Sequence, residues 1–396
     1  MGMVRNVSMY MAAAMMMTAA CSSPYLPEVG VDDECLSIKM MMPSAEFDEL
    51  ALTKSEANVG STQIDFVWSE DDVVGIFPET GSQLYFSMAE GAGKSNAVFD
   101  GGGWAMKKTA KYYSYFPFHP DFYMDKEAVP MSFVGQVQHG NGNLNHADLG
   151  SYNYMVAEGS YENGAMSFKY ERLAALFRFR IPVQAGTYTS LRVIAGTKCI
   201  ASEATFNALE IDYALNDPIY TDKVMLGLKN LSLASDGTLV GWMMLPPFNI
   251  LNDQLTIELT KSDGTVVTSS VAGKNYLRTY VYDNAPNFSI YPASASLSGA
   301  GESTTLKIIT SMSTSYEVST DVDWLTLGSV PSSGSASVTV TASTNPGAPR
   351  KGHVIVSETV NGVTLRNIMT VNQTINGMDV GVRDWENGDD EGGSVG

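Results

Sequence analysis

The sequence predicts an all-β protein built from antiparallel β-sandwiches, and three observations support this fold class. Short runs in which apolar and polar residues alternate, such as residues 177–181 and 255–260, recur along most of the chain. Alternation with a period of two is typical of half-buried strands. Turn dipeptides such as Asp263-Gly264 and Asn361-Gly362 separate the runs. Helical periodicity is weak, and only residues 203–215 are compatible with a turn or two of helix.

The first 20 residues have the features of a secretory signal. Arg5 provides a positive start, and residues 9–20 (MYMAAAMMMTAA) form an uncharged apolar run. This run is shorter than the roughly 20 apolar residues that span a bilayer. Cys21 directly follows two alanines, which resembles the bacterial lipobox, where the cysteine is lipidated and becomes the new N-terminus. We expect residues 1–20 to be a lipoprotein signal peptide and Cys21 to be the lipidation site; an ordinary signal peptide is the alternative.

Two segments are expected to lie outside the sandwiches. In residues 21–58, several prolines and many acidic residues interrupt any regular period, so we interpret this segment as a leader or tether. Residues 377–396 combine six acidic residues with a single arginine and several glycines. A segment of this composition buries too little apolar surface to offset the entropy lost on ordering. It is predicted to be an acidic disordered tail.

The region between these segments divides into three blocks by composition. Residues 59–165 are rich in aromatic side chains, residues 166–284 contain the clearest alternation, and residues 285–376 are rich in Ser, Thr and Val. We place a domain boundary at Pro286. Strands are expected at residues 177–181, 255–260, 276–282, 337–341 and 353–357. In the first of these strands, the two arginines are expected to face solvent.

The charge and the cysteines limit the possible partners. The chain has 24 Lys and Arg against 43 Asp and Glu, and its formal net charge is −19. Nucleic acids bind clustered basic residues, and anionic headgroups repel an acidic surface, so we expect no nucleic acid partner and membrane attachment only through the lipid. Besides Cys21, the chain contains Cys35 and Cys199. Export permits a disulfide between them, but the sequence favours free, buried thiols slightly and leaves their pairing open.

No constellation of residues predicts catalysis. Residues 91–95 (GAGKS) resemble a phosphate-binding loop, but Met88 occupies the position where that motif requires glycine. His139 and His146 flank a Gly-Asn loop with Asp148 nearby, and such a loop does not by itself provide the rigid, convergent ligands of a metal site. No serine or cysteine has the local context of a nucleophile. We therefore expect no enzyme activity, no cofactor and no metal.

Aromatic side chains provide a further candidate site. Residues 112–118 (YYSYFPF) have the composition of a platform on which sugar rings stack, but a strand that fills a sandwich core has the same composition. We favour the core. Arg278 lies among tyrosines and is a candidate for a cation–π contact of structural importance.

Residues 50–284 resemble the fimbrillin-like proteins of the Bacteroidales. The order of several loose motifs carries this resemblance. The motifs are Ala51-Leu52-Thr53-Lys54, the stretch WSEDDVVGIF at 68–77, Phe99 to Trp104, YYSYFP at 112–117, Gln136, DLGSYNYMVA at 148–157, Phe168 to Ile181, Leu245-Pro246-Pro247, Asp263-Gly264 and Ala272 to Tyr276.

Residues 288–374 resemble a BACON domain, a small immunoglobulin-like module. The stretches that carry this resemblance are Ser289 to Leu297, Asp323-Trp324-Leu325, Ser333-Gly334, Val338 to Asn345, Arg350 to Val356 and Val371-Asn372-Gln373. We expect Trp324 to anchor the core between the two sheets and residues 345–347 to form a turn before the next strand.

Together, the resemblances imply two tandem transthyretin-like β-sandwiches, at 59–165 and 166–284, followed by an immunoglobulin-like β-sandwich at 285–376. They imply a lipid-anchored, surface-exposed protein of the cell outer membrane that serves as a fimbrial tip, accessory or anchor subunit in adhesion. Its partners would be other fimbrial subunits, joined by donor-strand exchange after cleavage near Lys54. The alternative is a surface lipoprotein that binds host or dietary glycans or mucin and does not polymerise.

Overall fold

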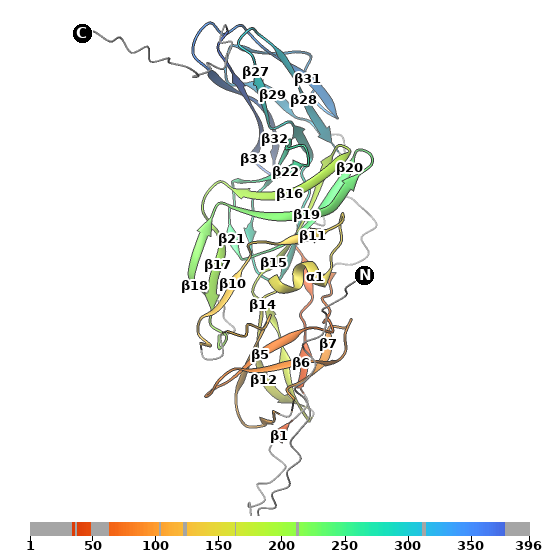
Figure 1. Cartoon of the computed structure of the whole chain (residues 1–396), viewed down its shortest axis with the longest axis vertical. Helices are drawn as coiled ribbons and strands as arrows, with labels where there is room; N and C mark the ends of the chain where they lie inside the picture. The colour runs from red at the N-terminus through yellow and green to blue at the C-terminus, as the bar shows by residue number, and fades with distance from the viewer. Residues whose placement is uncertain are drawn as a thin grey trace, which may run out of the picture.

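The computed structural model describes residues 34–35, 38–48, 63–102, 104–121, 125–162, 164–210, 214–310 and 314–376. Within these residues the regular structure is β, apart from one short helix, α1 (His146–Leu149), and a 3-10 turn, η3 (Gly150–Tyr152). The all-β prediction is confirmed. Figure 1 shows three sets of strands stacked along the long axis, with the C-terminal set at one end.

The first set of strands closes into a small barrel. In spatial order the ring contains β13 (Ala165–Lys169), β2 (Ile38–Met41), β7 (Asn96–Asp100), β6 (Leu84–Glu90), β5 (Val73–Pro78), β9 (Tyr112–Phe116) and β12 (Met155–Glu162). It closes because β12 also pairs with β13, and β14 (Glu171–Arg172) pairs with the start of β12. Trp68 lies in the barrel core and meets the rings of Phe99, Phe116 and Tyr170 edge-on. Closure leaves the ring without a free edge.

The second set consists of two packed sheets and two smaller pairings. One sheet has the order β20 (Gly237–Leu245), β15 (Ala175–Val183), β25 (Tyr280–Asn284), β3 (Ala45–Phe47) and β4 (Gln63–Ile64). The facing strands are β11 (Val137–His139), β19 (Lys223–Leu233), β16 (Gly186–Ala195), β22 (Gln254–Lys261) and β23 (Val266–Ala272). Alternate residues such as Phe177, Leu191 and Ile257 form the core between them. At the side, β10 (Val129–Ser132), β17 (Ile200–Phe206) and β18 (Leu215–Thr221) form a third sheet, and β21 (Phe248–Asn249) pairs with β24 (Asn275–Tyr276).

The third set continues one of these sheets. Strand β23 pairs with β26 (Phe288–Tyr291), which leads on to β28 (Ser303–Thr310), β31 (Ala336–Ala342) and β30 (Leu325–Leu327). A separate sheet has the order β27 (Ser294–Leu297), β33 (Val363–Gln373), β32 (Arg350–Val360) and β29 (Glu317–Thr320). A core that includes Ile290, Val338 and Val354 lies between the two sheets. One sheet therefore runs past Pro286, where the sequence suggested a boundary.

The barrel and the second set share a hydrophobic core. Phe77, Tyr115 and Val156 of the barrel belong to the same buried cluster as Leu176 and Met244 of the second set. At roughly 1.5–3 kcal/mol for each large apolar side chain that is buried, this shared cluster holds the two sets together.

Most of the expected strands are present, and two local predictions are wrong. Residues 255–260, 337–341 and 353–357 lie in β22, β31 and β32, and the Asn361-Gly362 hairpin has positive φ at both residues (51° and 82°), as a two-residue turn requires. Residues 276–282 do not form one strand, because Thr279 has a φ of 73° and separates β24 from β25. The described part of residues 203–215 (203–210, 214 and 215) is not helical. Glu203 lies in β17 and pairs with Ser132 of β10 and Ile219 of β18, and such cross-strand pairing overrides weak local propensity.

Candidate functional site

The N-terminal segment, residues 38–48, lies inside the fold rather than outside it. Strand β2 lies between β7, to which it is antiparallel, and β13, to which it is parallel. Strand β3 lies between β25 and β4 in the second set. The prediction that residues 21–58 are a tether is therefore wrong for residues 38–48, which complete the barrel and extend a sheet of the second set.

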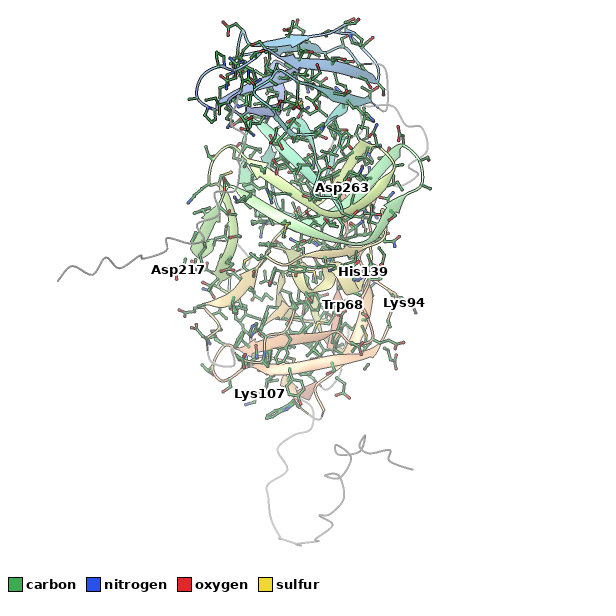
Figure 2. The ribbon with its side chains drawn as sticks, turned by 45° about the horizontal axis from the view of Figure 1, so that its top comes forward. Trp68, Lys94, Lys107, His139, Asp217 and Asp263 are labelled. Atoms are coloured by element: carbon green, nitrogen blue, oxygen red, sulfur yellow. The ribbon has the colours of Figure 1, made fainter. Side chains whose placement is uncertain are left out.

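The path of the chain explains how one short segment reaches both sets of strands. Strand β1 (Glu34–Cys35) pairs with β8 (Met106–Lys107), with Glu34 opposite Lys107. Figure 2 places Lys107 at the end of the barrel that is farthest from the C-terminal set. The chain therefore passes β8 at this far end, forms β2 within the barrel wall, and reaches the second set at β3.

The sequence of the N-terminal segment explains its two-part shape. Ile38, Met40 and Met42 alternate with polar or exposed residues and point into the barrel core, where they are at most 4% exposed. Pro43 follows, and since proline has no N–H to donate to a ladder, the first strand ends before it. Ala45 then begins the second strand in the shared core. The segment thus combines an apolar strand, a bend and a second short strand.

Arg172 holds the bend of the N-terminal segment from inside the protein. Its side chain is fully buried, and its Nη2 donates a hydrogen bond to the carbonyl oxygen of Pro43 at 2.8 Å. Nε donates to Asn153 Oδ1 at 2.7 Å, and the guanidinium lies 3.8 Å from the centroid of the Phe66 ring. Nη1 has no hydrogen-bond partner among the described residues. Burial lowers the pKa of Arg172 to about 9.

The second strand of the N-terminal segment lies against an ion cluster with a buried carboxylate and two partly exposed arginines. Arg178 and Arg180 each donate two hydrogen bonds to the carboxylate of Asp283, with N···O distances between 2.7 and 3.0 Å. Burial alone would raise the pKa of Asp283, but these hydrogen bonds outweigh it and hold the pKa below its ordinary value. The Arg178 guanidinium also lies 4.9 Å from the Phe47 ring centroid and 5.6 Å from that of Trp242. The expectation that the arginines of β15 face solvent is therefore wrong for Arg178, which these rings cover.

The end of the N-terminal segment is fixed by an ion pair. Lys274 Nζ lies 2.7 Å from Asp48 Oδ2, and the two side chains are 22% and 24% exposed. The backbone N–H of Asp48 also donates to the carbonyl oxygen of Val281 at 3.0 Å. Three cations from the rest of the chain, Arg172, Arg178 and Lys274, thus contact the segment at successive points.

The two site residues predicted from the sequence lie outside the described residues. Cys21 precedes them, and Lys54 lies between residue 48 and residue 63. The lipidation of Cys21 and the cleavage near Lys54 therefore stay predictions. Lys54 follows the N-terminal segment in sequence and precedes β4.

The loop between His139 and His146 is fastened to the fold through Asp148. His139 donates its backbone N–H to Asp148 Oδ2 at 2.8 Å, and its Nδ1 lies 2.7 Å from Asp148 Oδ1. Asn145 Oδ1 accepts the N–H of Asp148 at 2.9 Å, as an N-capping residue does at the start of a helix. These contacts give His139 a structural role beside α1. In the described part of the chain, no group of three or more His, Cys, Asp or Glu residues is arranged to hold a metal ion.

The loop that resembles a phosphate site is a turn of the barrel wall. Gly91 and Gly93 have positive φ, and the loop joins β6 to β7. The N–H of Trp68 donates to the carbonyl oxygen of Lys94 at 3.0 Å, and its indole N–H donates to that of Ser95 at 3.1 Å. Trp68 and Lys94 are labelled in Figure 2. Two carbonyl oxygens of the loop thus hold Trp68 in position by hydrogen bonds.

The aromatic candidates are largely core residues. In β9, Tyr112, Tyr115 and Phe116 are buried, so this strand fills the barrel core and the shared core as expected. Arg278 forms an ion pair with Glu171, with an N···O distance of 3.4 Å. Trp324 is only half-buried: it packs at the margin of the C-terminal core, where the Arg350 guanidinium lies 4.4 Å from its ring centroid.

Two further findings bear on the sequence predictions. Cys199 carries a free, half-buried thiol, whose pKa is raised by burial. Across the described ranges, none of the helical structure has the length and apolar character needed to cross a bilayer.

Sequence reasoning missed the residues that hold the N-terminal segment. The alternation of Ile38, Met40 and Met42 was present as a strand signal, but the prolines and acidic residues around it masked it. Nothing in the local sequence of Arg172 or Lys274 indicated a contact with a segment more than a hundred residues away.

A family model identifies part of the C-terminal set. The BACON family, described as "Putative binding domain, N-terminal", matches residues 314–374. This match confirms the resemblance for these residues. No curated protein matches the sequence.

Solved structures provide weaker likenesses. A "putative cell adhesion protein" from Bacteroides ovatus has 11% identity and a TM-score of 0.42, over 64% of this chain and 91% of that chain. The tip fimbrial protein Mfa3 from Porphyromonas gingivalis has 12% identity and a TM-score of 0.31, over 62% and 94%. A xyloglucanase from Bacteroides ovatus has 20% identity and a TM-score of 0.18, over 21% and 17%. The expected likeness to fimbrial and adhesion proteins is thus found, but at these TM-scores it does not establish the arrangement or the function of this chain.

Proposed function

We propose that this chain is a lipid-anchored adhesion protein of the bacterial outer membrane that acts as a tip, accessory or anchor subunit of a fimbrium. In this proposal Cys21 carries the lipid after removal of residues 1–20. Residues 59–165 and 166–284 are two transthyretin-like modules, residues 285–376 are an immunoglobulin-like BACON module, and residues 377–396 are an acidic tail.

The observation that carries the proposal is the position of the N-terminal segment. It is the first described strand of the barrel, it also extends a sheet of the second set, and residues 49–62 join it to the rest of the fold. A cut after Lys54 would leave residues 38–48 held by noncovalent contacts alone. Release of residues 38–48 would expose the β7 and β13 edges and the apolar groove between them. Strand addition requires such edges and such a groove. An extended segment of another subunit is the occupant that fits this groove.

A second observation favours this groove over the sheet edge at β20. Side-chain amides cover that edge: Gln138 accepts the N–H of Trp242 at 2.6 Å and donates to the carbonyl oxygen of Val240 at 2.9 Å. Gln136 binds both backbone groups of Met244 in the same way. Because these groups are already satisfied, β20 offers little to an incoming strand.

The experiment that tests the proposal examines the mature protein in its membrane. Mass spectrometry of the N-terminus, before and after assembly, is compared for the native chain and for Lys54→Ala. We expect a lipidated Cys21 in the precursor, a start at Ser55 in assembled material, and no assembly of the variant. Lys94→Ala, an exposed lysine in a barrel turn, is the matched control. An intact lipidated N-terminus in assembled material would contradict the proposal.

The alternative function, binding of host or dietary glycans, is favoured by the BACON match over residues 314–374 and its description as a binding domain. However, the four aromatic residues of 285–376, which are Phe288, Tyr291, Tyr316 and Trp324, are all buried or half-buried. Exposed aromatic rings lie elsewhere among the described residues, with Tyr85 and Trp104 both 58% exposed. A glycan array separates the functions: saturable binding that Trp104→Ala abolishes would support the alternative.

A further inference from the structure

The groove that residues 38–48 occupy runs between β7 and β13 in the barrel and between β25 and β4 in the second set, and it presents cations to the segment although the chain is acidic. The formal net charge of the protein is −19. Nevertheless, the side chains of the fold that meet residues 43–48 through polar or cation–π contacts include Arg172, Arg178 and Lys274. Each contacts a different part of the segment, so each favours a different chemical group in the segment that occupies the groove.

Arg172 fixes the register of the segment in the groove, and it does so without contacting the side chains that would distinguish one segment from another. It binds a backbone carbonyl, that of Pro43, which any residue can supply. Because the guanidinium is buried, an occupant that left it without an acceptor would carry the cost of an unpaired buried charge. The occupant is therefore fixed along its length at this point.

Arg178 and Lys274 contact neighbouring side chains and can therefore distinguish occupants. The Arg178 guanidinium, held in place by Asp283, faces the ring of Phe47. An aromatic ring attracts a guanidinium over its face. Lys274 forms an ion pair with the carboxylate of Asp48, the next residue. Both contacts are partly shielded from water. Charge interactions are stronger in such a shielded environment than on an open surface.

We propose that the groove selects its incoming segment by an aromatic residue followed directly by a carboxylate, read by Arg178 and Lys274. This inference rests on the proposed function, and it adds the chemistry of the partner. The occupant is an extended segment from another polypeptide with apolar side chains at the positions of Ile38, Met40 and Met42. The aromatic and acidic residues follow in the register that Arg172 sets.

Peptide exchange on the full chain tests the proposal. A site-specific protease sequence replaces residues 51–54, and the chain is cut there after folding. A labelled peptide of residues 34–48, with Cys35→Ser, then competes for the groove, and fluorescence anisotropy reports its affinity. We compare it with peptides carrying Asp48→Asn, Asp48→Lys, Phe47→Leu or, as a matched control, Glu46→Gln, because Glu46 is exposed.

We expect Asp48→Asn and Phe47→Leu each to weaken binding about fivefold, Asp48→Lys to weaken it about tenfold or more, and Glu46→Gln to leave it within about twofold, in line with partly buried charge and cation–π contacts. Lys274→Glu in the protein should reverse the order of affinity, so that the Asp48→Lys peptide binds more tightly than the unaltered peptide. This charge swap also controls for misfolding, since a damaged groove would bind neither peptide. Raised salt should weaken the unaltered peptide more than the Asp48→Asn peptide.

The outcomes separate the inference from the proposed function. If the unaltered peptide enters the groove but the changes at positions 47 and 48 have no effect, the inference is overturned and the proposed function stands. If no peptide replaces the N-terminal segment, strand exchange itself is overturned, and the inference with it.

Discussion

Replacing Met40 with alanine removes a buried side chain from the strand that closes the barrel. Met40 is 1% exposed and packs in the cluster that contains Trp68 and Phe168. Substitution of a fully buried methionine by alanine costs about 2–5 kcal/mol, because apolar contact is lost and a cavity remains. Met41 provides the matched control, since the adjacent residue is also methionine but is 43% exposed. Met41→Ala should change stability by less than about 0.5 kcal/mol.

The chain has several packed units, so a single unfolding transition is not assumed and a local measurement is preferable. Hydrogen exchange followed by mass spectrometry reports the opening of the amides of β7 and β13, which flank β2. For Met40→Ala we expect their protection to fall by about 30-fold to several thousand-fold, which corresponds to the free energies above. Amides of β32 and β33, in the C-terminal set, should be unchanged. Equal effects of Met40→Ala and Met41→Ala would refute the assignment of β2 as a core strand.

Three further predictions concern other parts of the fold. Gln138→Ala leaves the backbone N–H of Trp242 without the acceptor that Gln138 Oε1 provides, and hydrogen exchange at the β20 amides should show a loss of about 1–3 kcal/mol. Asp283→Asn removes a buried charge that pairs with two partly exposed arginines, and should cost up to about 3 kcal/mol at neutral pH. Because the pKa of Asp283 is held below its ordinary value, this stabilisation is present above that value and is lost as the pH falls through the folded-state pKa; the gap between wild type and variant should shrink in acid. Gly75→Ala places a methyl group against the Tyr115 ring, so we expect β5 and β9 to pack poorly and the urea midpoint to fall. An unchanged near-UV circular dichroism spectrum and urea midpoint would contradict this expectation.

Local sequence patterns were sufficient to locate many of the strands. The alternation in residues 255–260 and 337–341 corresponds to β22 and β31, whose buried and exposed residues alternate as expected. The Asn361-Gly362 turn also followed from its residues, because asparagine and glycine tolerate positive φ. In each case the signal and the structure that it specifies lie within a few residues of each other.

The same patterns did not reveal what surrounds each strand. The arginines of β15 alternate with buried aromatic residues and were expected to face water, but the structure covers Arg178 with Phe47 and binds it to Asp283. Alternation distinguishes the two faces of a strand and does not show whether another segment covers the polar face.

The sequence by itself determined that this is an acidic all-β protein, in which apolar and polar residues alternate along the strands, and that it has a C-terminal BACON segment. Only the tertiary structure decided that residues 38–48 close the barrel, and that Arg172 holds Pro43 across 129 residues of chain. The physical reason is that strand pairing and charge burial are set by partners brought together in space. A local pattern fixes which side chains point inward, but the segment against which they pack depends on the burial achieved by the whole chain.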